Sequence, residues 1–219
     1  MNHVVNESGE QGDCDHWTPY TDSVSLWTRV GTLCARVAVA LCLVGGDARA
    51  TSTGHPRRHT IDSLIIHSLG GPDCKDGTRF FKEVDGDALS WAKTFASLPG
   101  VSIHYVIGRD GTVVSAVPED LAASHAIGWN QRSIGIELVN NGDGTDPFPA
   151  AQIAALVRLA REIRKRHGDV ALERVLRHSD VDHTMFPAET FGAGCAAYRR
   201  KLDPGAAFPW EAFRVALGR

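Results

Sequence analysis

Two histidines and one aspartate lie where short apolar or turn-forming segments end. His67 closes a run of three apolar residues, His178 ends a second short apolar segment, and Asp203 stands in the turn-forming sequence KLDPG. Imidazole nitrogens and a carboxylate oxygen are ligands that suit Zn²⁺. Three protein ligands leave the fourth position open, as hydrolytic zinc sites require and structural ones do not. These residues predict a hydrolytic zinc site with one ion per chain.

Two further residues could serve the chemistry of such a site. Glu137 ends the segment SIGIE, and Lys201 precedes Asp203 by two positions. A carboxylate can take a proton from water and return it to a leaving amine. An ammonium group can stabilise an oxyanion. We therefore predict Glu137 and Lys201 as catalytic residues, the alternatives being a surface carboxylate at a strand end and a solvated lysine.

The segment SHAIGWN contributes candidate substrate contacts. His125 is predicted to line the cleft, where it contacts substrate or supports a metal ligand. Trp129 could pack on a sugar ring, and the amide of Asn130 could bind hydroxyl or carbonyl groups. His104, within an alternating apolar segment, is predicted to be a core histidine or a support for a ligand.

The elements that must position these residues follow from periodicity and turn chemistry. We expect apolar or alternating strands, amphipathic helices closed by proline or glycine, a loop over 70–77 and a linker over 51–60. The expected strands are 63–67, 103–107, 113–117 and 133–140, and the expected helical segments are 88–98, about 149–167 and 209–217. The pattern predicts one mixed α/β domain over 51–219.

Composition and the N-terminal region bear on location and partners. A net charge of -3 over 219 residues gives no sign of a nucleic-acid partner, and we expect a monomer. Residues 33–46 are mostly apolar, and Ala48 and Ala50 fit a small-x-small cleavage site. Residues 1–50 are therefore predicted to carry a secretory signal, whose true start lies near Val30, or an uncleaved membrane anchor. The alternative is an unstructured cytosolic extension. After cleavage only Cys74 and Cys195 would remain, and a disulfide between them becomes plausible.

The order of these segments resembles a known family. The series LIIHS, IHYVIGRDGTV, SHAIGWNQRSIGIELVN, RHSD and KLDPG is similar to the type 2 zinc family of N-acetylmuramoyl-L-alanine amidases over about residues 58–217. The resemblance implies a central mixed β-sheet flanked by helices, with zinc in a groove across one face. It matches His67, His178 and Asp203 to zinc ligands, and Glu137 and Lys201 to catalytic positions.

The same resemblance implies a reaction and a place for it. The expected activity is hydrolysis of the amide bond between N-acetylmuramic acid and L-alanine in peptidoglycan or muropeptides, in the periplasm or cell envelope if the chain is exported. Two alternatives remain: a non-catalytic peptidoglycan-binding module and a cytosolic amidase that recycles anhydro-muropeptides.

One feature departs from the family pattern. Twenty-four residues separate His178 from Asp203, where shorter relatives have about ten. We expect this insertion to be a long loop at the rim of the groove that shapes substrate choice. The alternative is that His183 or Cys195, both within it, replaces Asp203 as the third ligand.

Overall fold

The structure, a computed structural model, describes residues 48–49, 54–168 and 170–218. The predicted signal or anchor at 33–46 lies outside the described residues, and so does most of the region 1–50. Among the helices of the described ranges, none combines the length and the apolar character needed to cross a membrane.

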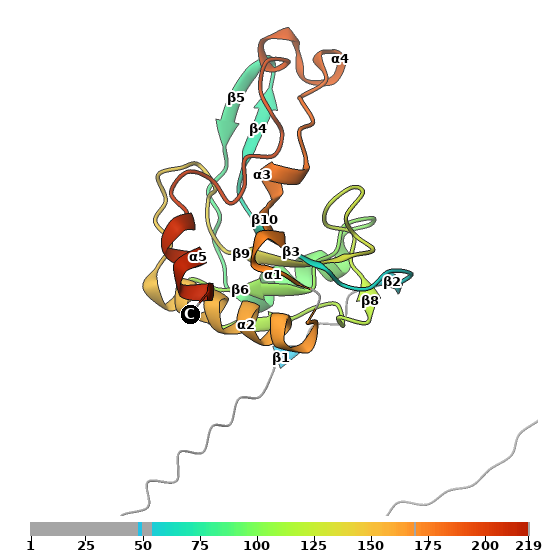
Figure 1. Cartoon of the computed structure of the whole chain (residues 1–219). Helices are drawn as coiled ribbons and strands as arrows, with labels where there is room; N and C mark the ends of the chain where they lie inside the picture. Colours follow the sequence, from blue (N-terminus) through green and yellow to red (C-terminus); the bar gives the residue numbers. More distant parts are fainter. Residues whose placement is uncertain (1–47, 50–53, 169, 219) are drawn as a thin grey trace, which may run out of the picture. The chain divides into compact units, whose positions relative to one another are not determined.

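The described residues are built around a six-stranded mixed sheet (Figure 1). Its strands, in spatial order, are β1 (Ala48–Arg49), β7 (Val113–Ser115), β6 (Tyr105–Ile107), β9 (Ser133–Leu138), β3 (Ser63–Ser68) and β10 (Val175–Arg177). β6 and β7 pair antiparallel, and every other neighbouring pair is parallel. The predicted mixed sheet is confirmed.

The two faces of the sheet differ in how they are covered. Leu64 and Ile66 of β3 and Ile136 of β9 pack with α2 (Ala150–Arg166) and α5 (Trp210–Gly218) in the larger apolar cluster. On the opposite face, α1 (Ala88–Ser97) packs with Val106 and Val114 of β6 and β7. Because successive strand residues alternate between faces, His67 and Glu137 belong to the face that α1 covers only in part.

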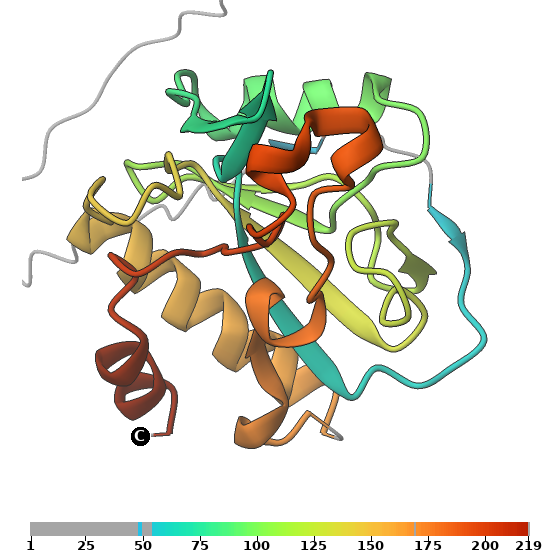
Figure 2. The ribbon, with the colours of Figure 1, turned by 90° about the horizontal axis from the view of Figure 1, so that it is seen from above.

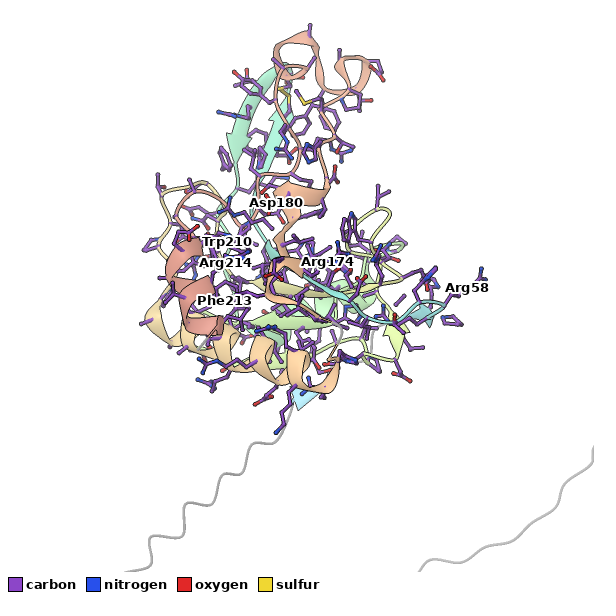
Figure 3. The ribbon with its side chains drawn as sticks, in the orientation of Figure 1. Arg58, Arg174, Asp180, Trp210, Phe213 and Arg214 are labelled. Carbon is purple, nitrogen blue, oxygen red and sulfur yellow. A yellow bond between two sulfur atoms is a disulfide. The ribbon has the colours of Figure 1, made fainter. Side chains whose placement is uncertain are left out.

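The helices begin and end close to the predicted positions. α2 has the expected apolar stripe, with Leu156, Ala160 and Ile163 buried, and Pro149 precedes its first turn. α5 inserts Phe213, which is fully buried, and Trp210 of the same helix lies beside it (Figure 3). The Arg177 guanidinium lies over Trp210, 4.7 Å from the ring centre. α5 therefore anchors the C-terminal segment to the larger cluster.

Two sequence predictions about loops were wrong. Residues 70–77 include β4 (Pro72–Lys75), which pairs antiparallel with β5 (Thr78–Phe81). Asp76 and Gly77 between them both have positive φ, as a two-residue hairpin turn requires. The linker predicted over 51–60 contains β2 (His55–Pro56), which pairs with β8 (Leu121–Ala122).

Strand limits differ slightly from the prediction over 103–107 and 113–117. The regular strands are shorter, but Ala116 and Val117 still donate to the carbonyls of His104 and Ile103, at 2.8 and 3.2 Å. The pairing continues there in irregular backbone.

The insertion after His178 is folded, which corrects the prediction of one long loop. η1 (Leu172–Arg174) and β10 come before His178, which begins α3 (His178–Val181). After α3, the insertion forms α4 (Ala188–Phe191), η2 (Ala193–Cys195) and an antiparallel bridge between Met185 and Arg199. It lies against the β4–β5 hairpin (Figure 2). A disulfide joins Cys74 of β4 to Cys195, the pair that the sequence made plausible. We call the hairpin and residues 182–202 together the lobe.

Candidate metal centre

The three predicted metal ligands converge from adjacent parts of the sheet. His67 is the fifth residue of β3, and His178 is the first residue of α3, directly after the neighbouring strand β10. Asp203 lies where the chain returns from the lobe, and its carbonyl accepts a hydrogen bond from the Ser179 backbone at 3.1 Å. The parallel pairing of β10 with β3 brings His178 close to His67, and the chain that returns from the insertion brings Asp203 to the same place.

The donor atoms face one another at the distances of a metal site. His67 Nδ1 lies 2.9 Å from His178 Nδ1 and 3.3 Å from Asp203 Oδ2, and His178 Nδ1 lies 2.9 Å from the same oxygen. Two ligands of a tetrahedral zinc with bonds of about 2.0–2.1 Å are separated by about 3.3 Å. All three residues are buried. The donor set and its spacing fit a zinc ion.

Electrostatics agree with this donor set. Burial lowers the pKa of His67 to about 4, which keeps its imidazole neutral, as a metal ligand must be. Burial would raise the pKa of Asp203, but the close contacts of its carboxylate with the rings of His178 and His67 outweigh burial and hold the pKa well below its usual range. A buried carboxylate beside two imidazoles is stabilised by a cation between them.

Glu137 lies next to His67 on the same face of the sheet. The two residues are register partners in the parallel pairing of β3 with β9. Burial, and then the charge of Asp203, raise the pKa of Glu137 to about 8, whereas Lys201 acts in the opposite direction. A bound dication would add to the effect of Lys201. A carboxyl group with a raised pKa beside a metal-ligand set suits proton transfer near neutral pH.

The alternative third ligands lie away from this cluster. His183 is exposed, with Nε2 3.1 Å from the Asp180 carbonyl, and Cys195 is held in the disulfide. Within the described ranges, the residues grouped closely enough to hold a metal are His67, His178 and Asp203. His104 is fully buried and accepts from the Gly135 backbone at 3.0 Å, as predicted for a core histidine.

Sequence reasoning missed the residues behind His178. Asp182, which directly follows α3, places Oδ2 3.8 Å from His178 Nε2. Its other carboxylate oxygen accepts from the backbone and hydroxyl of Thr184 at 2.9 and 2.7 Å. Arg199 donates to the carbonyls of Ser179 and Asp182. The start and end of the insertion are thereby tied to the helix that begins with a metal ligand.

The three predicted substrate contacts have partners within the chain. The His125 ring lies 3.0 Å from His67 Nε2. Asn130 Oδ1 accepts from the backbone of His125 and Ala126 at 2.9 and 2.7 Å. The Trp129 ring lies under the Arg174 guanidinium, 5.0 Å from the ring centre. Substrate contact by Trp129 and Asn130 stays a prediction.

A groove runs past the metal ligands in two connected parts. A cavity of about 150 Å³ is lined by the three predicted metal ligands and, on its apolar side, by Phe95 and Val101. A second, of about 290 Å³, shares Ser68, Leu69, Lys201 and Asp203 with the first. It continues toward the lobe, where Lys82, Asp73 and Arg200 line it. One end of the groove is therefore apolar and the other charged.

A larger cavity lies elsewhere. It measures about 670 Å³ and is lined by His55, His59, Asp62 and Arg132 among others. It borders Asp62, just before β3, whereas His67 is near the strand's other end, and the two sites share no lining residue. The converging ligand atoms, and not the cavity volume, mark the functional site.

Arg57 is a structural centre that no pattern in the sequence indicates. Within the segment predicted as linker, its guanidinium donates to the carbonyls of Glu119, Leu121 and Gln131 at 3.1, 2.7 and 2.8 Å. These carbonyls belong to the two loops that flank His125. Arg57 therefore holds the loop that reaches the metal site.

Comparisons with known proteins agree with the geometry. The family model described as N-acetylmuramoyl-L-alanine amidase matches residues 57–206. The chain is 31% identical over 188 residues to 1,6-anhydro-N-acetylmuramyl-L-alanine amidase AmpD of Enterobacter cloacae, an alignment that covers 78% of this chain and 90% of that protein.

Two solved structures have the same fold. The crystal structure of a selenomethionine AmpD derivative matches with a TM-score of 0.54 and 26% identity, covering 80% of this chain and 96% of that one. The Escherichia coli amidase AmiD, in complex with anhydro-N-acetylmuramic acid-L-Ala-D-gamma-Glu-L-Lys, matches with a TM-score of 0.51 and 28% identity, covering 75% of this chain and 59% of that one.

Proposed function

The chain belongs to the N-acetylmuramoyl-L-alanine amidase family, whose members hydrolyse the amide bond between N-acetylmuramic acid and L-alanine. From this premise we propose that His67, His178 and Asp203 hold one catalytic zinc ion. The convergence of two Nδ1 atoms and one carboxylate oxygen within 3.3 Å of one another is the observation that carries the proposal. When bound, zinc supplies a Lewis acid that polarises the scissile carbonyl and lowers the pKa of water.

The side chains around the ligands divide the remaining work. Glu137 takes a proton from the attacking water and delivers it to the amide nitrogen as the bond breaks. Lys201, which lines the same cavity, places positive charge beside the carbonyl oxygen, where negative charge develops. The retention of all five residues supports an enzyme over a binding-only module.

The groove supports a muropeptide as substrate. The scissile amide has a sugar on one side and a peptide with ionised groups on the other. A groove with an apolar end at Phe95 and a charged end at Arg200, with the metal ligands between them, can hold both sides of such a bond. The AmiD complex contains a substrate of this class.

The disulfide supports action outside the cytoplasm. A bond between Cys74 and Cys195 forms and persists in an oxidising compartment and is rare in the reducing cytosol. We include export to the periplasm or cell envelope in the proposal. The cytosolic recycling role remains the second candidate, favoured by the identity to AmpD. Fractionation that finds the chain only in the cytosol with free Cys74 and Cys195 thiols would favour the second.

Removal and return of zinc tests the metal assignment. We expect the purified chain to hold about one zinc, to lose hydrolysis of a muramyl tripeptide when a chelator strips the metal, and to regain it when zinc is added. His178→Ala should hold far less zinc, whereas His183→Ala should match the native chain. Full activity of the stripped protein, or full zinc occupancy in His178→Ala, would refute the proposed centre.

A further inference from the structure

His125 lies behind the metal ligand His67, and its contacts define where the protons of both rings lie. His67 Nε2 is 3.0 Å from His125 Nδ1, and His125 Nε2 is 3.2 Å from the hydroxyl oxygen of Ser133. The Ser133 hydroxyl in turn donates to the carbonyl of Trp129 at 2.8 Å. These contacts form one continuous chain from the metal site into the protein.

The carbonyl at the end of this chain sets the direction of every hydrogen bond. A carbonyl oxygen only accepts, so the single proton of the Ser133 hydroxyl is used there. Ser133 must then accept from His125 Nε2, which leaves His125 Nδ1 with a lone pair. That lone pair accepts from His67 Nε2, so His67 Nδ1 carries no proton. His67 Nδ1 is the atom that faces His178 and Asp203.

The surrounding residues hold His125 in this position. Asn130 Oδ1 accepts from the backbone N–H groups of His125 and Ala126. Gly135 on β9 makes room for the ring, since a Cβ there would lie 2.6 Å from His125 Cγ. The hydrogen bonds and the missing side chain fix the position of the ring, which also lines the cavity beside the metal ligands.

We propose that His125 and Ser133 form a positioning relay that keeps the proton of His67 on Nε2 and its Nδ1 lone pair directed at the zinc. His125 is then a positioning residue that acts through His67, rather than a substrate contact. Partners of this kind, which orient a metal-bound histidine, typically change metal affinity by about 10–100-fold. The inference rests on the proposed zinc site.

The test measures zinc affinity by competition with a chromophoric chelator, using the full chain. We expect His125→Ala to weaken zinc binding by about 10–100-fold. His125→Asn should stay close to native affinity, because Asn Oδ1 occupies the place of Nδ1 and is always an acceptor.

Ser133 supplies the sharper arm of the experiment. Ser133→Ala should weaken zinc binding in the native background, because the His125 ring can then adopt the wrong tautomer. In the His125→Asn background the same substitution should have no effect, since an amide oxygen needs no partner to remain an acceptor. Ser63→Ala is the matched control: Ser63 is the register partner of Ser133, is equally buried, and its hydroxyl bonds Asp62.

Each outcome distinguishes the relay from a packing role or a substrate contact. Equal losses from Ser133→Ala in both backgrounds would assign Ser133 a packing role and overturn the relay. Unchanged zinc affinity in His125→Ala, with a raised KM, would return His125 to substrate contact. A native chain that binds no zinc would instead refute the proposed function itself.

Discussion

At the scale of single residues, the site combines two neighbouring strand positions, His67 and Glu137, with three residues from outside the sheet: His178, Lys201 and Asp203. His67 and Glu137 are adjacent because β3 and β9 pair in parallel, which puts a metal ligand beside a carboxyl group on one face. Asp203 and Lys201 reach the same cavity from the end of the lobe. The strand pair fixes the geometry of the proposed ligand His67 and the proposed base Glu137, and the chain returning from the lobe brings the charges of Lys201 and Asp203.

Glu137 provides the first prediction. Glu137→Gln should lower kcat by about 10²–10⁴-fold, because the amide cannot take a proton from water. Zinc content should remain near one per chain, since Glu137 is outside the ligand set. Steady-state hydrolysis of a muramyl tripeptide and metal analysis of the same sample check both parts. A variant with native kcat would remove Glu137 from the mechanism.

Lys201 and Arg200 are adjacent cations that should behave differently. Lys201→Met should lower kcat by about 10²-fold, because its charge is needed most as the oxyanion forms. Arg200 lines only the charged part of the groove, so Arg200→Met should raise KM and leave kcat near its native value. Identical effects of the two substitutions on kcat and KM would contradict this division.

The sequence pointed to the three residues that the structure brings together as candidate ligands, but not to the residues that support them. His67, His178 and Asp203 are residues of metal-ligating types, and each stands at the end of a short apolar segment or in a turn-forming sequence that can be recognised locally. Arg57 acts through backbone carbonyls far along the chain, and Ser133 acts through the Trp129 carbonyl and the His125 ring. Their roles depend on which loops meet in space, and spacing in the sequence does not contain that information.

At the scale of elements, a partly buried carboxylate joins α2 to the sheet. Glu119 accepts hydrogen bonds from Tyr105 and Arg166, both at 2.6 Å, and lies 2.6 Å from His167 Nε2. Burial alone would raise the pKa of Glu119, but the hydrogen bonds from Arg166, Tyr105 and His167 outweigh it and lower the pKa to about 2. The folded state therefore favours the ionised carboxylate.

This cluster predicts a pH-dependent effect on stability. The stabilisation from Glu119 is fully present above its ordinary pKa of 4.5 and is lost as the pH falls toward 2. Glu119→Gln should lower the free energy of unfolding by about 2 kcal/mol near pH 7, and the difference should shrink as the pH falls from about 4.5 toward 2. Urea unfolding near neutral pH and at low pH measures the difference in the free energy of unfolding between the native chain and the variant. Glu189→Gln, at an exposed position, is the control. An equal loss at both values would contradict the ion-pair account.

The lobe depends on its disulfide. Its own apolar cluster contains Phe186 and the two cysteines, with Phe191 packed against them. Such a small core cannot stabilise an independent unit, and a bridge that closes a loop of more than about 100 residues contributes about 2–4 kcal/mol.

Loss of the bridge should therefore loosen the lobe first. Cys74→Ser with Cys195→Ser should make residues 182–202 cleavable by protease while the sheet remains resistant, and reductant should do the same to the native chain. Mass analysis of the early fragments locates the cuts, and reductant should have no effect on the double variant. A lobe as resistant as the native one would show that packing alone holds it.

Helices were more predictable than the lobe for a physical reason. The stripe of Leu156, Ala160 and Ile163 is a local pattern that any buried helix face needs. The β4–β5 hairpin has a D-G turn at Asp76 and Gly77, but the glycines and proline before it mask the signal. Its strands pack against apolar residues that the distant insertion supplies. Their own apolar residues therefore do not alternate as they would in a strand that covers a local core.

At the scale of the whole molecule, sheet order decides where the chemistry lies. The order β1-β7-β6-β9-β3-β10 puts the two strands that carry His67 and Glu137 side by side, with β10 leading into His178 beyond them. α2 and α5 close one face, while α1 covers β6 and β7 on the other and leaves the ends of β3 and β9 to the groove. The mixed sheet was expected from the resemblance, but periodicity does not encode strand order.

The central claim is that this groove cleaves one bond of a muropeptide, and product masses test it most directly. Anhydro-N-acetylmuramic acid-L-Ala-D-gamma-Glu-L-Lys should be converted by the zinc-loaded chain to the free sugar acid and the intact tripeptide, together heavier than the substrate by one water. Neither product should form with the chelated chain. Cleavage within the peptide, or the same products without zinc, would contradict the account.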